Sequence, residues 1–562
     1  MMKIPAKAKA SLVLLTAAGL TFQAASASDL LPLSRHSPLA SSPPPTATAD
    51  LAGKVGALID GVSRSSRAVS TVAITVVDYE ISLRGLSRDS EEYLRKLSEV
   101  HSRSAKRILE LCEANKGFYV KAGQFVAALR QVPEEYVSKL SSLQNKAVPC
   151  PFKAIRDVLI NNLGQDLSCI FCSFDEVPIA AASIAQVHRA VLKDSNEVAV
   201  KVQYPGLDRQ MKLDMMIMSF LSKSITWLFP EYRFEWLVGE FVKAISLELD
   251  FIQEGKNAER TAKNFISNDK VKVPKVVWEL TTSQVLTMEF CRGSKVDDLE
   301  YMEKMGIDPT KVARTLVEVF AEMIFVHGFV HGDPHPGNIL VSPEGKSGFS
   351  LVILDHGVYK QLDEQFRLDY CQLWKALILS DSTRVQQLSE CFGVGKYSRY
   401  FPLILTGRTI DSKSALGEAM SVEEKGKLKK DLKSLRMEDV SSFVEALPPD
   451  FLIVLRADGL LRAIIRKLCA SQRLRLLTYA RFALYGLFQE PTTQSALSGS
   501  AAAVLFSKLR GNLSYLKVRV VLGLLELLSW MERARRLLFK MINHLYVATG
   551  PSVKGHYLTS AL

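Results

Sequence analysis

The sequence predicts an α+β fold with two lobes, a helical extension before them and a helical tail after them. Three observations support this prediction. The short β-branched strand "VAVKV" (198–202) is followed by a helical stretch rich in carboxylates. The loop "HGFVHGDPHPGNILV" (327–341) leads to an apolar strand that ends at Asp355. From residue 297 on, "YMEKMG" and "PTKVARTLVEVFAEMIFVHGF" predict successive helices, which we assign to the second lobe.

The first strand carries one lysine, Lys201, in an otherwise apolar alternation. A lysine in such a strand is costly to bury unless a carboxylate pairs with it. The stretch "EFVKAISLELDFIQEGKNAER" (240–260) has the apolar pattern of a helix and offers Glu248, Asp250 and Glu254. We therefore expect the lysine of the strand to pair with a carboxylate of this helix.

The loop at 327–341 has two interpretations. In the first, His331, Asp333 and His335 converge on a metal ion, joined by His327. In the second, Asp333 belongs to a catalytic loop for phosphoryl transfer. The rest of the chain has to decide between them.

The second interpretation is favoured by the order of the parts. Asp333 and Asn338 have the spacing of H-R-D-x-x-x-x-N, and Asp355-His356-Gly357 stands in place of Asp-Phe-Gly. Strand lysine, helix glutamate, Asp–Asn loop and Asp-x-Gly follow one another as in a protein-kinase-like fold. The expected roles are then specific. Asp333 orients the acceptor, Asn338 and Asp355 hold Mg²⁺, and Lys201 holds the α- and β-phosphates of ATP. The loop histidines become a scaffold that hydrogen-bonds the backbone.

A glycine-rich phosphate loop is expected before the lysine strand, but the chain has "VPIAAASIAQVHRAVL" (177–192) there. Alanine does not adopt positive φ as cheaply as glycine, so nucleotide binding should have a different geometry or turnover should be restrained. The alternative is tight packing between two strands. The candidates for nucleotide binding in this part of the chain are Ala180, Ala181, Ala182 and Ser183, to which we add Glu289 further along.

Together these segments resemble the aarF-domain-containing, UbiB-like atypical kinases, and they are most similar to the mitochondrial branch of that family. The resemblance covers roughly residues 80–380. It is carried by "KAGQ" (121–124), "AAASIAQVH" (180–188), "VAVKVQYP" (198–205), "ELDFIQEGKNAE" (248–259), "HGFVHGDPHPGNILV" (327–341) and "LDHG" (354–357).

The resemblance implies that Lys121 and Gln124 lie on a helical extension that folds over the active site and regulates it. Lys121 would contact Glu248 and Asp250, and Glu254 would pair with Lys201. The helical spacing of Lys121 and Gln124 alone would indicate no more than an exposed polar face. The resemblance also implies that the extension blocks a protein-substrate groove, which argues against protein kinase activity.

The expected function is that of an atypical kinase or ATPase that binds Mg-ATP. Its acceptor would be a small lipid-like molecule, or hydrolysis would serve quinone or membrane-lipid homeostasis. Two alternatives stay open. Antibiotic- and choline-type small-molecule kinases have a similar "HGD" loop, and a catalytically weak nucleotide-binding scaffold would keep the same residues.

The formal charge of +12 favours an anionic partner such as a nucleotide or a lipid surface. Nucleic acid is not expected, because no basic stripe alternates with aromatic residues. The eight scattered cysteines predict free thiols, with the close pair Cys169 and Cys172 buried rather than metal-bound.

The expected organisation has six parts. Residues 1–28 form a targeting sequence or membrane anchor, 29–80 a linker, 81–150 the helical extension, 151–296 the first lobe, 297–490 the second lobe and 491–562 a helical tail that can associate with a membrane. The expected location is the mitochondrion, at its inner membrane, with the plastid as the alternative.

Overall fold

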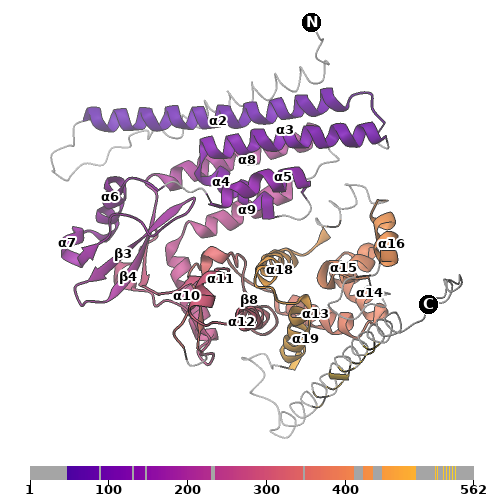
Figure 1. The fold of residues 1–562 in the computed structure, drawn as a ribbon. Coiled ribbons are helices and arrows are strands. Elements are labelled where there is room, and N and C mark those ends of the chain that lie inside the picture. The colour runs from indigo at the N-terminus through magenta and orange to yellow at the C-terminus, as the bar shows by residue number, and fades with distance from the viewer. Residues whose placement is uncertain are drawn as a thin grey trace, which may run out of the picture.

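The computed structural model describes residues 47–87, 90–128, 132–145, 149–228, 235–345, 348–409, 420, 422–433, 443 and 446–488, with isolated helical positions between 513 and 538. These residues form the predicted two-lobed α+β fold. The first lobe holds a twisted sheet, the second lobe is mainly helical, and long helices lie across the top of the first lobe (Figure 1).

The helical extension begins earlier than the sequence predicts. It consists of α2 (Ala47–Leu83), α3 (Glu91–Asn115), α4 (Gly117–Ala128), α5 (Glu134–Leu140) and η1 (Ser141–Asn145). The assignment of residues 29–80 to a linker is therefore wrong from residue 47 on. The Ser- and Ala-rich composition hides a helical repeat whose small side chains Ala68 and Ala73 are buried, so that α2 packs closely on α3 and α8.

The first lobe is built on an antiparallel sheet in the order β1-β3-β4-β6, with β2 paired to β3. Its strands are β1 (Phe171–Phe174), β2 (Ala180–Ala181), β3 (Ala185–Leu192), β4 (Glu197–Gln203) and β6 (Val285–Glu289). Its helices are α6 (Phe152–Leu163), α7 (Leu167–Ile170), α8 (Leu207–Leu228), α9 (Glu235–Glu248) and α10 (Phe251–Asn264), and η2 (Trp278–Leu280) precedes β6.

The alternation of β4 separates two cores. Val198, Val200 and Val202 point to one face, where they pack with α6 and α7. Ala199 lies on the opposite face, against a core shared by α8, α9, α10 and the extension helices. Lys201 has the same parity as Ala199, so its side chain leaves the sheet toward α10.

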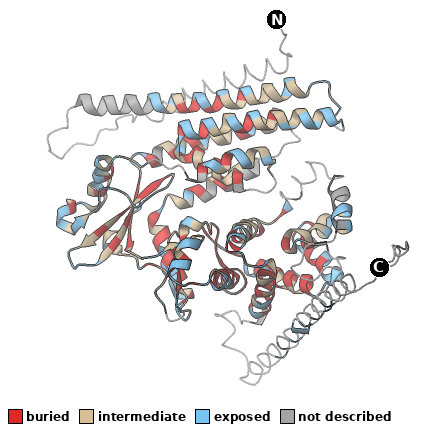
Figure 2. Ribbon diagram, in the orientation of Figure 1, coloured by how far each residue is buried: buried red, intermediate tan, exposed pale blue. Residues whose placement is uncertain are grey.

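The second lobe carries the loop at 327–341 between short strands and a helical core. It contains a sheet in the order β5-β10-β9-β7 and the pair β11-β8. These strands are β5 (Val271–Lys272), β7 (Ser294–Lys295), β8 (Phe329–His331), β9 (Ile339–Ser342), β10 (Ser350–Ile353) and β11 (Tyr359–Gln361). Its helices are α11 (Leu299–Lys304), α12 (Pro309–Ala321), the π-helix η3 (Glu322–His327), η4 (Pro336–Asn338), α13 (Glu364–Ile378), α14 (Ser382–Cys391), η5 (Gly395–Tyr400), α15 (Phe401–Thr406), α16 (Val422–Lys433), α18 (Pro449–Lys467) and α19 (Gln472–Phe488). Buried residues concentrate where these helices meet (Figure 2).

The predicted N-terminal targeting sequence or membrane anchor (1–28) lies outside the described residues, as does most of the predicted tail. The isolated tail positions that are described are helical, and those with apolar side chains are exposed, among them Leu513, Leu527 and Leu538. Within the described part of the chain, no helix has both the length and the apolar character needed to cross a bilayer.

All eight cysteines are free thiols, as predicted. The expected burial of Cys169 and Cys172 is wrong, because both side chains are exposed. They lie where α7 runs into the edge strand β1, and the buried positions of this segment go to Leu167 and Phe171 instead.

Candidate active site

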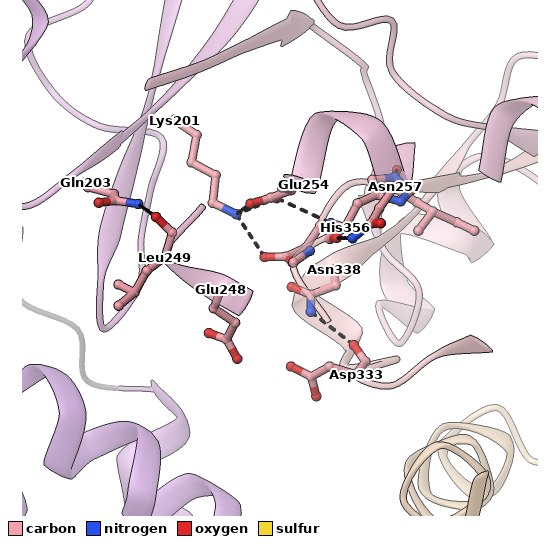
Figure 3. A network of polar contacts seen from close by, with 12 residues as sticks. Lys201, Gln203, Glu248, Leu249, Glu254, Asn257, Asp333, Asn338 and His356 are labelled. Atoms are coloured by element: carbon pink, nitrogen blue, oxygen red, sulfur yellow. Dashed lines mark hydrogen bonds and ion pairs between the residues drawn. The ribbon is translucent and has the colours of Figure 1, made fainter. Parts of the chain in front are cut away.

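The centre of the site is a buried ion cluster between the two lobes. The Lys201 ammonium lies 2.6 and 2.9 Å from the two carboxylate oxygens of Glu254 on α10, and 3.2 Å from Oδ2 of Asp355 (Figure 3). The ring of Phe251 lies 5.0 Å from the same ammonium. The pair expected between strand lysine and helix carboxylate is present, and Glu254 is the carboxylate that forms it.

The ion cluster keeps Lys201 and Asp355 charged. Burial opposes the charge of Lys201, but the carboxylates of Asp355 and Glu254 outweigh it and raise the pKa of this lysine. Burial also works against ionisation of Asp355, yet Lys201 and the N–H of Gly357 hold the pKa of this carboxyl well below its usual range. Burial raises the pKa of the Glu254 carboxyl, against the attraction of Lys201. Asp355 is therefore an anion with hard oxygen ligands available.

His356 takes the place of phenylalanine in Asp-Phe-Gly and acts as a scaffold. Its backbone N–H donates to Glu254 (3.3 Å), and its carbonyl accepts from the Asn257 amide (2.9 Å). Burial lowers the pKa of its imidazole to about 3, so the ring is neutral. Nε2 donates to the carbonyl of Ile353 and Nδ1 accepts from the Tyr359 hydroxyl, both at 3.1 Å. α10 and β10 are thus tied together directly beside Asp355.

The loop at 327–341 brings Asp333 and Asn338 close together. The Asn338 amide nitrogen donates to the carbonyl of Asp333 (3.1 Å), which closes the loop and leaves the amide oxygen for another partner. The backbone carbonyl of Asn338 accepts from Leu354, next to Asp355 (2.9 Å). An amide oxygen just before β9 and an ionised carboxylate just after the adjoining strand β10 match the hard ligands of Mg²⁺. Asn338 and Asp355 therefore fit the metal role predicted for them.

The histidines of this loop hold its shape. His331 is fully buried, and its Nδ1 accepts the backbone N–H of Asp333 (3.3 Å). Nδ1 of His335 accepts the N–H of Gly337 (3.2 Å). Burial lowers the pKa of both rings. Among the residues described, no three His, Cys, Asp or Glu side chains gather as metal ligands, so the histidine-metal interpretation has no support in the structure.

The extension reaches the site through Lys121 on α4. Its ammonium lies 2.7 Å from Glu248 at the end of α9. Burial opposes its charge, but Glu248, Asp333 and Asp355 together raise its pKa, so Lys121 lies in the field of these three carboxylates. Glu248 and Asp333 point toward the same region beneath the Lys201–Glu254 pair (Figure 3).

Two other residues of these motifs have structural contacts. Asp250 accepts the N–H groups of Ile252 and Gln253 (3.0 and 3.4 Å) as the N-cap of α10, in place of the implied contact with Lys121. Gln124 donates to the carbonyl of Leu143 in η1 (3.0 Å) and so fastens α4 within the extension.

Close packing around Gly123 explains why this position of the Lys-Ala-Gly-Gln segment is glycine. A Cβ atom there would lie 2.4 Å from Cδ1 of Leu143 and 3.1 Å from Sγ of Cys112. The close approach of α3, α4 and η1 therefore requires glycine at this point of the helix.

The alanine loop is a tight hairpin between β2 and β3. The N–H of Ala182 donates to the carbonyl of Ala185 (2.8 Å), and the Tyr204 hydroxyl donates to the carbonyl of Ala182 (2.9 Å). Residues 180–185 are all described and none has a positive φ, so glycine is not required. Ala180 and Ala181 form β2 and pair with β3, and Ser183 lies in the bend between the two strands. Because the Ala182 N–H is used inside the hairpin, this loop offers phosphate fewer free donors than a glycine loop does.

Glu289 lies at the end of β6, where the chain passes from the first lobe to the second. Its carboxylate pairs with Lys272 (2.9 Å), and its N–H donates to the carbonyl of Lys275 (2.8 Å). The Glu289 side chain thus contacts β5 through Lys272. Its strand, β6, is the edge strand of the sheet and pairs with β4, which carries Lys201.

Sequence reasoning missed one residue of the site. Arg456 on α18 lies 3.4 Å from Oδ1 of Asp333. It stands 123 positions after that aspartate in a region without a motif, so no local signal could have indicated it.

Comparison with known proteins agrees with this geometry. Residues 142–389 match the ABC1 atypical kinase-like domain family. AarF domain-containing protein kinase 1 of Mus musculus is 43% identical over 408 residues, which are 72% of this chain and 78% of that protein. AarF domain-containing kinase 1 of Drosophila melanogaster is 37% identical over 74% of this chain and 80% of its own. A solved complex of Rv3197 with erythromycin from Mycobacterium tuberculosis covers 69% of this chain and 99% of its own, with 24% identity and a TM-score of 0.45.

The family model and the two AarF relatives match an ABC1/AarF kinase rather than an antibiotic- or choline-type kinase. With a lysine–glutamate pair between its lobes, an Asp–Asn catalytic loop and this extent of identity, the chain belongs to the ABC1/AarF atypical kinase family.

Proposed function

We propose that this protein transfers the γ-phosphoryl group of Mg-ATP to a small, lipid-like acceptor, or to water in an ATPase cycle that serves quinone or membrane-lipid homeostasis. The observation that supports this most directly is the shared ion cluster of Lys201, Glu254 and Asp355 beside Asp333. Lys201 is poised for the α- and β-phosphates, and Asp333 faces the region where an acceptor would enter.

The residues have distinct tasks in this mechanism. Lys201, kept in place by Glu254, binds the phosphates. Asn338 and Asp355 would hold Mg²⁺, which when bound neutralises charge on the phosphate oxygens. Asp333 orients the hydroxyl or water and receives its proton. The new bond forms between that oxygen and the γ-phosphorus, while the bond to the bridging oxygen breaks and its electron pair leaves with ADP.

The position of the extension supports a small acceptor. Lys121 pairs with Glu248, and Asp333 and Asp355 also raise its pKa, so α4 comes close to the site. The family resemblance implies that this extension covers the groove that a protein substrate needs. We propose that Lys121 and Gln124, with the alanine hairpin Ala180–Ser183, restrain turnover until a membrane or lipid cue relieves them. The +12 charge suits an anionic lipid surface, and a mitochondrial inner-membrane location accords with the mitochondrial branch that the sequence resembles.

Mg²⁺-dependent ATP hydrolysis tests this function against a nucleotide-binding scaffold. We expect wild-type protein to bind Mg-ATP and to hydrolyse it, with addition of lipid vesicles raising the rate, and we expect Asp355→Asn to abolish the Mg²⁺ dependence. If the wild type binds Mg-ATP but hydrolyses it no faster than Asp355→Asn, the scaffold function replaces the kinase function. Imaging a C-terminal fluorescent fusion, with and without residues 1–50, tests the location.

A further inference from the structure

Arg456 lies beside Asp333, and its ion pair with this aspartate is longer than the ion pairs of the other two cations at the site. Its guanidinium lies 3.4 Å from Asp333, whereas Lys201 lies 2.6 Å from Glu254 and Lys121 lies 2.7 Å from Glu248. The side chains of Arg456 and Asp333 are partly exposed, at 22% and 25%. The pair is therefore open to a third group, and its solvent-screened attraction is small.

The helix that carries Arg456 is fixed on the catalytic loop. One turn before it, Ile453 packs so closely on Gly332 that a Cβ there would lie 2.8 Å from its Cδ1. At the start of α18, Asp450 pairs with Lys360 of β11 (2.8 Å). Arg456 is thus held at a constant place relative to Asp333 by a rigid helix rather than by a loop.

The guanidinium itself is not fully used. Its Nε is buried and donates to no group. The ring of Phe125 on α4 lies 5.6 Å from its central carbon, which steadies the side chain from the extension side without consuming a hydrogen bond. Arg456 therefore lies between the extension and the catalytic aspartate with donors to spare.

Phosphoryl transfer needs cations near the transferred group, because charge spreads over its equatorial oxygens in the transition state. Lys201 is held by two carboxylates, and Lys121 is paired with Glu248. His335, two positions after Asp333, is neutral because burial lowers its pKa. Of these three described cations, Arg456 has the longest ion pair, so it can change partners at the least cost.

We propose that Arg456 is an arginine finger supplied in cis, which leaves Asp333 and binds the γ-phosphoryl oxygens as the group passes from ADP to the acceptor oxygen. Asp333, released from the guanidinium, is then free to receive the proton of the acceptor. This inference rests on the function proposed above. The planar fork of five N–H donors suits a phosphoryl group better than an ammonium does, so lysine should replace it poorly.

The test uses the full chain and compares Arg456→Gln and Arg456→Lys with Arg466→Gln, which removes an exposed arginine from the same helix. Four quantities are measured: the Kd for Mg-AMP-PNP, the retention of Mg-ADP with aluminium fluoride as a transition-state mimic, and kcat and KM for ATP hydrolysis. We expect Arg456→Gln to lower kcat by about 10³-fold, the low end of the range for arginine fingers. Mg-AMP-PNP binding and KM should stay within about threefold, because the finger acts in the transition state. Retention of the mimic should be lost, and Arg466→Gln should behave as wild type.

Phe125→Leu is a second variant that leaves the arginine in place. Without the ring we expect a smaller loss of kcat, about tenfold, again with unchanged Mg-AMP-PNP affinity. Unchanged kcat and mimic retention in folded Arg456→Gln would overturn the finger and leave the proposed function intact. A rise in kcat would also overturn it and make Arg456 a restraint on Asp333. If the wild type neither hydrolyses ATP nor retains the mimic, the proposed function fails, and the finger fails with it.

Discussion

Glu254→Gln is the sharpest test of how the ion cluster works. The change keeps the shape of the side chain and removes one buried negative charge. In the wild type one ammonium is shared by two carboxylates, at 2.6 and 2.9 Å for Glu254 and 3.2 Å for Asp355. In the variant Asp355 becomes the one charged partner of Lys201 in this cluster, so the lysine shifts toward the carboxylate that should hold Mg²⁺. A charge-assisted hydrogen bond stabilises by about 1.5–3 kcal/mol and a neutral one by about 0.5–1.5 kcal/mol.

The difference of about 1–1.5 kcal/mol corresponds to roughly tenfold in affinity. We therefore expect the Mg²⁺ concentration for half-maximal AMP-PNP binding to rise about tenfold in Glu254→Gln. Isothermal titration at fixed nucleotide measures it, and Glu279→Gln, which changes an exposed carboxylate in η2, is the matched control. Mg²⁺ dependence equal to that of the control would refute the idea that Glu254 competes with Asp355 for Lys201.

Three further predictions concern the hairpin and the extension. Ala181→Gly should change ATP affinity by loosening the hairpin, measured by nucleotide titration; an unchanged Kd would remove the regulatory role of the loop. Gly123→Ala should cost about 1–3 kcal/mol in urea unfolding, because its methyl group collides with Leu143, and stability at or above wild type would contradict this. The Arg103 hydrogen bond lowers the pKa of Asp78 to about 2. Its stabilising effect is thus complete above about pH 4 and is lost as the pH falls through 2, so Asp78→Asn should flatten thermal stability over this acidic range and cost roughly 1 kcal/mol at pH 7 after solvent screening.

The sequence predicts those parts of the site that rest on local rules. The position of Lys201 in an apolar strand predicts a carboxylate partner, because burying an unpaired ammonium is costly. Glu254 is that partner. Asp333 and Asn338 are found by their spacing, since one short loop sets both positions. The same rules predict the neutral, structural histidines.

Long-range packing accounts for what the sequence does not predict. Arg456 reaches Asp333 because α18 docks on the catalytic loop at Gly332, a contact that no local pattern encodes. The sequence does not predict helix α2, because the repeating positions of this helix are mostly Ala, Ser and Val rather than large apolar residues. Asp250 caps α10 through a local hydrogen bond to Ile252. This role is not predicted, because the resemblance assigns Asp250, together with Glu248, to contact with Lys121.

The packing also indicates which parts of the molecule move together. The extension and the first lobe share one buried core, in which Phe118 and Leu140 of the extension meet Phe241 and Leu286 of the lobe. Separating them would expose this apolar surface at roughly 25 cal/mol per Å². The contact of α4 with α18, by contrast, is the ring of Phe125 against the Arg456 guanidinium. We therefore expect the lobes to open between α4 and α18, with the extension travelling on the first lobe. During nucleotide exchange the Lys121–Glu248 pair would then stay intact and move with the first lobe. The contact between Phe125 and Arg456 would break.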